Sequence, residues 1–253
     1  MNFNGVTEYL LRWCVEKREE YFRRNLQERA DTGRSLLFVK RFFFDEMTYK
    51  VLYLVDRDFS DFGAYQAAVR ELIPLRKSYV LEHEKDPEAL ALLLKAEQEC
   101  RDYVNRLRET DWAPSKCYCR AVFGEERERL EYAILEKWNY RAEYWYPLVG
   151  SPVGETLFLN VEYLEPYWDR LCALTGLPEA RLYEYGESCY EDGQILEVDV
   201  MESYGGTECA YLPKDLSWII YFSHENTVSF AGSIIGAVKE LLADEREHWN
   251  KWE

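Results

Sequence analysis

The spacing of apolar residues along the chain predicts several amphipathic helices. Between residues 5 and 30, apolar side chains recur every three or four positions, which is the period of one helix face. The best marked helix follows Asp86, a capping residue type, and Pro87, which favours the first helical turn. We expect helices over residues 5–30, 62–75, 86–109, 125–138 and 161–174, and from residue 233 onward.

Runs of aromatic and β-branched residues predict strands between these helices. Residues 35–44 and 48–55, separated by a short polar loop, have the composition of a β-hairpin. Further strands are expected over residues 116–123, 181–185, 194–201, 218–223 and 227–231. Helices and strands occur in blocks rather than in strict alternation, which predicts an α+β fold. We expect amphipathic helices packed on antiparallel sheet, with a C-terminal β-hairpin and a closing helix.

The periodic pattern breaks after residue 110, where Asp111, Trp112 and Pro114 interrupt it. We therefore expect an N-terminal part over residues 1–110 and an acidic α+β part over residues 111–253, either as two domains or as one continuous domain. The chain has 253 residues, of which 47% are hydrophobic and 31% charged. That composition excludes an intrinsically disordered chain and a membrane protein.

Acidic residues are concentrated in the C-terminal part. The formal net charge is −16, of which residues 151–253 contribute −14, from 6 basic and 20 acidic side chains. Between residues 179 and 225, only Arg181 and Lys214 oppose eleven acids. Such a field repels nucleic acids and anionic membranes and attracts basic proteins. The alternative is that the acids only keep an intracellular protein soluble.

Tyrosines alternate with the acids in this part of the chain, and tyrosine is enriched at protein interfaces. The sequence therefore predicts an acidic, tyrosine-rich face that binds a basic protein partner. Its candidate residues are Tyr183, Tyr185, Tyr190, Glu197, Asp199, Glu202, Tyr204, Tyr211, His224 and Glu225.

The sequence contains no known catalytic signature: neither a glycine-rich phosphate loop nor a G-x-S-x-G elbow is present, and no catalytic residue or cofactor is predicted. One alternative is a divalent-metal-dependent enzyme on a phosphorylated or sugar substrate, with Asp56 and Asp58 as ligands, since hard cations prefer carboxylate oxygens. The competing interpretation is a turn in which Ser60 or Asp61 caps the next helix. A third possibility is a structural, self-associating role for exposed aromatic residues.

The seven cysteines occur at irregular spacings, which argues against a disulfide framework and for a reducing compartment. The first twenty residues lack the basic segment and apolar run of a secretory signal. We therefore expect a cytoplasmic protein.

An aromatic strand, a Ser-His-Glu turn, a threonine-containing return strand and a closing helix follow one another from Trp218 through Gly232. Over residues 181–242 this arrangement resembles the C-terminal part of uncharacterised bacterial domains that are similar to the immunity proteins of polymorphic toxins. The resemblance implies an intracellular bacterial protein that binds and blocks a toxin domain.

Overall fold

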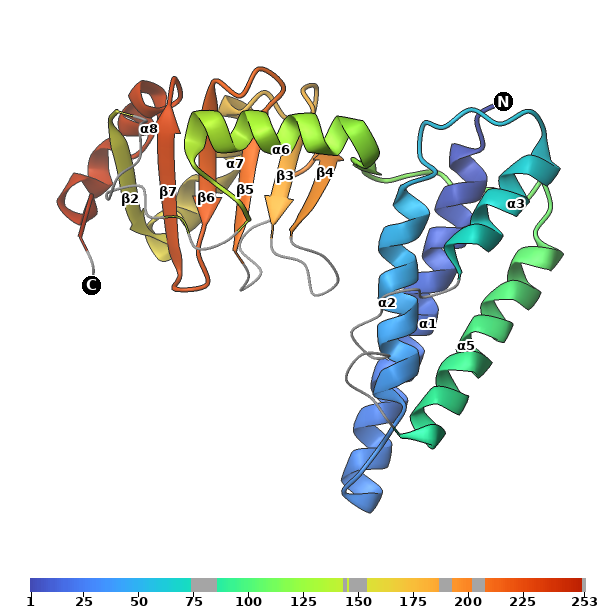
Figure 1. Cartoon of the computed structure of the whole chain (residues 1–253). Coiled ribbons are helices and arrows are strands. Elements are labelled where there is room, and N and C mark those ends of the chain that lie inside the picture. Colours follow the sequence, from blue (N-terminus) through green and yellow to red (C-terminus); the bar gives the residue numbers. More distant parts are fainter. Residues whose placement is uncertain (74–85, 143–144, 146–153, 187–192, 202–207, 252–253) are drawn as a thin grey trace. The chain divides into compact units, whose positions relative to one another are not determined.

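The computed structural model describes residues 1–73, 86–142, 145, 154–186, 193–201 and 208–251. The chain divides into two compact units, Met1–Lys116 and Cys117–Glu253, which are described separately. The first is helical and the second is built on an antiparallel sheet (Figure 1). Together they confirm the α+β class.

The first unit contains the helices α1 (Asn4–Thr32), α2 (Phe38–Leu52), α3 (Phe62–Leu72) and α5 (Pro87–Arg106). Local signals set several of their ends. The Asp61 carboxylate accepts the Ala64 N–H at the start of α3, and Asp86 accepts the Glu88 N–H at the start of α5. Gly33 ends α1 in the left-handed conformation, with φ of 77°. The helices predicted over 5–30, 62–75 and 86–109 are confirmed as α1, α3 and α5, although residues 74 and 75 lie outside the described part of the chain.

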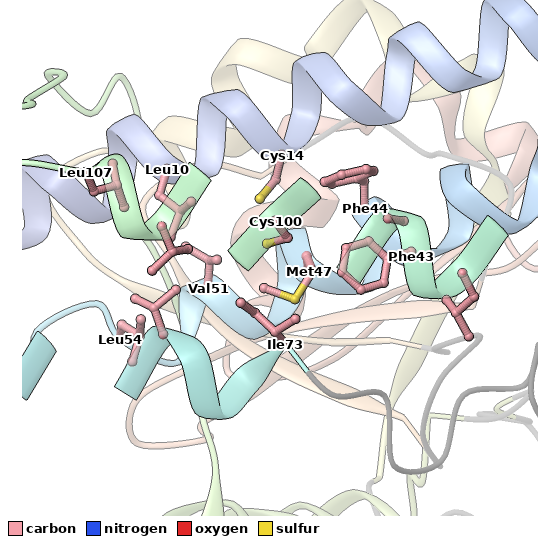
Figure 2. Close-up of a cluster of buried hydrophobic side chains, with 14 of the residues drawn as sticks. Leu10, Cys14, Phe43, Phe44, Met47, Val51, Leu54, Ile73, Cys100 and Leu107 are labelled. Atoms are coloured by element: carbon pink, nitrogen blue, oxygen red, sulfur yellow. The ribbon is translucent and has the colours of Figure 1, made fainter. Parts of the chain in front are cut away.

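The predicted β-hairpin over residues 35–55 is wrong, because most of this segment forms α2. Its aromatic and β-branched composition favours a strand, but Val39, Phe43, Met47 and Val51 recur every four residues and are all fully buried. This stripe packs against α1 and α5 in the core of the unit (Figure 2). Burial therefore overrides the local β propensity.

The core of the first unit also holds two thiols, those of Cys14 on α1 and Cys100 on α5 (Figure 2). Burial raises the pKa of Cys14 well above its ordinary value and that of Cys100 to about 12. Both cysteines are free and uncharged, and they pack as small apolar side chains.

The second unit contains an antiparallel sheet with the strand order β1-β4-β3-β5-β6-β7-β2 in the described part of the chain. Its strands are β1 (Cys119–Ala121), β2 (Thr156–Asn160), β3 (Leu182–Gly186), β4 (Gln194–Val198), β5 (Cys209–Pro213), β6 (Trp218–Phe222) and β7 (Thr227–Gly232). The predicted strands are confirmed as β1, β3, β4, β6 and β7. Strands β2 and β5 were not predicted.

The helical segments of this unit are α6 (Gly124–Trp138), η1 (Val161–Tyr163), η2 (Glu165–Tyr167), α7 (Trp168–Leu174), α8 (Ile235–Leu241) and η3 (Ala243–His248). The helix predicted over 161–174 is therefore a pair of 3₁₀ turns followed by a short α-helix. The predicted closing helix is α8, continued by the 3₁₀ segment η3.

Helices cover both faces of the sheet, with α6 in front of the strands and α7 behind them in Figure 1. Tyr185, Ile195, Ala210 and Tyr221 form one row across β4, β3, β5 and β6, and this row is buried with Trp138 of α6. On the opposite face, the Trp168 ring of α7 lies 6.0 Å from the Phe222 ring of β6. No helix in the described ranges has the length and apolar composition needed to cross a membrane.

Candidate binding site

Glu197 of β4, a predicted partner-binding residue, is instead part of an internal ion-pair cluster. Its side chain lies inside the fold, and the residue is only 6% exposed. Its carboxylate is 2.7 Å from the Arg120 guanidinium and 2.7 Å from the Lys214 ammonium. Burial opposes ionisation, but the hydrogen bonds from Lys214 and Arg120 outweigh it and lower the pKa of Glu197. The charge of Glu197 is thus neutralised within the fold.

Asp199 extends the pairing of β1 with β4. Its carboxylate accepts the Tyr118 N–H at 2.7 Å, and its own N–H donates to the Tyr118 carbonyl at 3.3 Å. Tyr183 on β3 is half-buried, and its ring centre lies 3.9 Å from the Lys214 ammonium. Both residues therefore have internal roles beside the Glu197 cluster.

Two of the predicted interface tyrosines are core residues. Tyr185 is 4% exposed and Tyr211 is 3% exposed, so neither ring is accessible to a partner. Tyr185 packs under α6, and Tyr211 contacts Phe222 edge to face. The expected tyrosine-rich surface is thus reduced, because the two rings lie on opposite faces of the sheet and helices cover both faces. Tyr190, Glu202 and Tyr204 lie outside the described residues.

The β6–β7 turn does expose two of the predicted residues, His224 and Glu225. The His224 side chain is 57% exposed, and its Nδ1 contacts the carboxylate of Glu208, a residue that is 4% exposed. Glu208 Oε1 also accepts the His224 N–H, whereas Oε2 is buried without a hydrogen-bond partner among the described residues. Sequence reasoning missed Glu208, because nothing in the local pattern before β5 distinguishes a buried acid from an exposed one.

A pocket of about 450 Å³ opens beside this turn. It lies between the turn and the segment that follows β2, and it contains carboxylate, amide, indole and aliphatic groups. The lining residues are Asn160, Val161, Glu162, Leu164, Glu165, Trp168 and Asn226. The size is that of a small-ligand site or of a pocket that admits one side chain of a partner.

A backbone hydrogen bond joins the two sides of the pocket, and a side-chain cap orders one of them. The Val161 N–H donates to the Asn226 carbonyl at 2.8 Å, and Asn160 Oδ1 accepts the Glu162 N–H at 3.0 Å. Asn226 has φ of 60°, in the left-handed region that asparagine tolerates better than most residues. The pocket is therefore formed by the fold itself.

The carboxylates of the pocket differ from that of Glu197 in having no internal cation. Glu162 and Glu165 are exposed, and neither forms an ion pair with a described residue. Among the described residues, the lining of the pocket includes two acids and no lysine, arginine or histidine. The pocket consequently presents uncompensated negative charge next to an indole ring.

The loop proposed for metal binding has a different local geometry. Asp56 accepts from the Asn4 side chain at 2.7 Å, and Asp58 lies 3.5 Å from the amino group of Met1. Asp61 caps α3, as the capping interpretation predicted. Within the part of the chain that the structure describes, no group of three or more His, Cys, Asp or Glu residues is arranged to hold a metal ion.

The chain was compared with protein families, with curated proteins and with solved structures. No family model, no curated protein and no solved structure matches the chain.

Proposed function

We propose that this chain is a non-enzymatic, intracellular bacterial protein that binds a basic protein partner, in the manner of an immunity protein that blocks a toxin. The observation that carries the proposal is the pair of exposed carboxylates of Glu162 and Glu165 in a preformed pocket, neither of them neutralised by a described residue. The acidic field of residues 151–253 supports the same partner chemistry.

The proposed contact surface differs from the one expected from the sequence. It consists of the pocket together with His224 and Glu225 of the β6–β7 turn. The indole of Trp168 replaces the buried rings of Tyr185 and Tyr211 as the aromatic contact. Aromatic anchors supply most of the affinity at such interfaces, while surrounding charges accelerate and orient the encounter.

Charge reversal at the pocket tests this proposal. The chain and a Glu162→Lys/Glu165→Lys variant are used to capture proteins from bacterial cytoplasm at low salt, and bound proteins are eluted at high salt and identified. We expect the unchanged chain to retain a basic protein that salt releases, and the pocket variant to lose at least about tenfold in binding of the purified partner.

A matched control carries Glu128→Lys and Glu136→Lys on α6, where both glutamates are exposed. This control variant changes the net charge as much as the pocket variant does, but at positions outside the pocket. If the control loses the partner as strongly as the pocket variant, overall charge rather than the pocket is responsible. If no basic protein is retained, or if reversal at the pocket leaves binding unchanged, the proposal is wrong.

A further inference from the structure

Building on the proposed function, we infer that the pocket binds the side chain of one arginine of the protein partner. The guanidinium of that arginine is recognised by a row of three pocket residues, Glu162, Glu165 and Trp168.

This row follows from the local backbone. The three residues are three positions apart, and they lie in η1, in η2 and at the first residue of α7. Side chains three residues apart are aligned in a 3₁₀ helix, whereas an α-helix offsets them around its axis. All three residues line the same pocket.

The chemistry of the row suits a cation with a flat, partly apolar surface. Two carboxylates can accept hydrogen bonds from the several N–H groups of a guanidinium, and an indole face stacks on its plane. An anion would be repelled by Glu162 and Glu165, and a neutral ligand would leave both charges uncompensated. Lysine satisfies the charge but offers neither the forked hydrogen bonds nor the planar stacking surface.

The fold also lowers the cost of binding. Val161 is held to the β6–β7 turn by its hydrogen bond to Asn226, and the Tyr167 hydroxyl donates to Glu245 of η3 at 3.1 Å. Tyr163 stacks on His248, with ring centres 3.8 Å apart. Contacts to the β6–β7 turn and to η3 therefore hold the segment that carries the two acids and the indole. Little of this segment must become ordered when an arginine side chain enters the pocket.

The test uses small probes on the whole chain. Nα-acetyl-arginine amide, its lysine counterpart and its citrulline counterpart are titrated, and the indole N–H signals are followed by NMR. Citrulline has nearly the shape of arginine without its charge. Trp168→Phe identifies the relevant indole signal, and Glu162→Gln/Glu165→Gln removes both charges while keeping the side-chain size.

We expect the arginine amide to shift the Trp168 signal saturably, with a Kd on the order of 1 mM for so small a ligand. The lysine and citrulline amides should bind at least about fivefold and tenfold more weakly, respectively, and the double glutamine variant should abolish the shift. Equal binding of citrulline would assign the pocket to a neutral hydrogen-bonding ligand, and equal binding of lysine would remove the specificity for arginine. Either result, or no shift with the arginine amide, overturns the inference.

The arginine titration can fail or succeed independently of the partner-capture experiment. A partner whose binding depends on Glu162 and Glu165, together with no response to the arginine amide, leaves the proposed function standing and rejects the arginine site. A saturable response to the arginine amide without any basic protein partner rejects the proposed function, and with it a partner's arginine as the occupant, although the pocket still binds a guanidinium.

Discussion

Asn250 satisfies both outward-facing main-chain groups of Phe158, the central residue of the edge strand β2. The Asn250 N–H donates to the Phe158 carbonyl at 2.8 Å, and Asn250 Oδ1 accepts the Phe158 N–H at 3.0 Å. One residue thus takes the place that a further strand would occupy. Edge strands with unpaired groups are sites of unwanted association, and this contact protects β2 at its centre.

Removing the Asn250 side chain should release the Phe158 N–H. We expect Asn250→Ala to lower the free energy of unfolding by about 1–2 kcal/mol, from the lost hydrogen bond and from the left-handed backbone at φ of 56°, and to accelerate exchange of the Phe158 amide hydrogen. Asn250→Asp is the matched control, because it retains an acceptor oxygen. Unchanged protection of the Phe158 amide in the alanine variant would contradict the role assigned to this contact.

The Glu197 cluster should be necessary for the stability of the second unit. Glu197→Gln removes the carboxylate that Arg120 and Lys214 share and, among the described residues, leaves Arg120 paired with Glu126 alone. We expect a loss of about 3 kcal/mol in the free energy of unfolding, at the lower end of the range for breaking buried ion pairs because Lys214 is partly exposed. Urea denaturation measures this loss. Glu128→Gln on the exposed face of α6 should change stability by less than about 0.5 kcal/mol, and equal effects of the two substitutions would refute the prediction.

The same cluster predicts a pH dependence. The pKa of Glu197 in the folded chain lies below its ordinary value of 4.5, so the folded state holds its proton less tightly than the unfolded state does. The stabilisation is therefore complete above about pH 4.5 and is lost as the pH falls through the folded-state pKa. We expect the difference in unfolding free energy between the unchanged chain and Glu197→Gln to be constant at roughly pH 6 to 8 and to shrink below pH 4.5. A difference that grows on acidification would contradict this sign.

In the first unit, the hydroxyl of Tyr21 joins three helices. It donates to Glu99 of α5 at 2.7 Å and accepts from Lys40 of α2 at 3.0 Å, while its ring stacks against Phe44. Tyr21→Phe keeps the ring and removes both hydrogen bonds. We expect a loss of about 1–2 kcal/mol in the free energy of unfolding, since both partners are charged groups.

The control for this substitution is Tyr132→Phe on α6, where the tyrosine is exposed. It should leave thermal and urea unfolding unchanged. A Tyr21→Phe variant as stable as this control would show that Glu99 and Lys40 are satisfied equally well by water.

The sequence predicts an element's ends correctly where those ends are set by residues close together in the chain. Asp86 followed by Pro87 marks the start of α5, and the polar turn at His224 separates two apolar runs that become β6 and β7. Capping and turn formation depend on residues a few positions apart, so a single sequence contains the necessary information.

Long-range packing decided the elements that local pattern misassigned. The segment around Phe43 and Met47 has strand-like composition but forms α2, because α1 and α5 bury its four-residue stripe. The acidic β4 residue Glu197 resembles a surface charge until β1 and the loop after β5 place Arg120 and Lys214 around it. The residues next to Glu197 or Phe43 in the sequence do not indicate which distant side chains contact them or how deeply they are buried.

The sequence by itself determined the α+β class, the concentration of negative charge after residue 150 and the exposed turn at His224, since these depend on composition and short-range spacing. Only the tertiary structure decided which acids remain uncompensated. The Glu197 charge is cancelled by cations from other elements, whereas Glu162 and Glu165 stand beside Trp168 in a pocket. The physical reason is that an acid's electrostatic effect depends on its distance from opposite charges and from water, and the fold sets both distances.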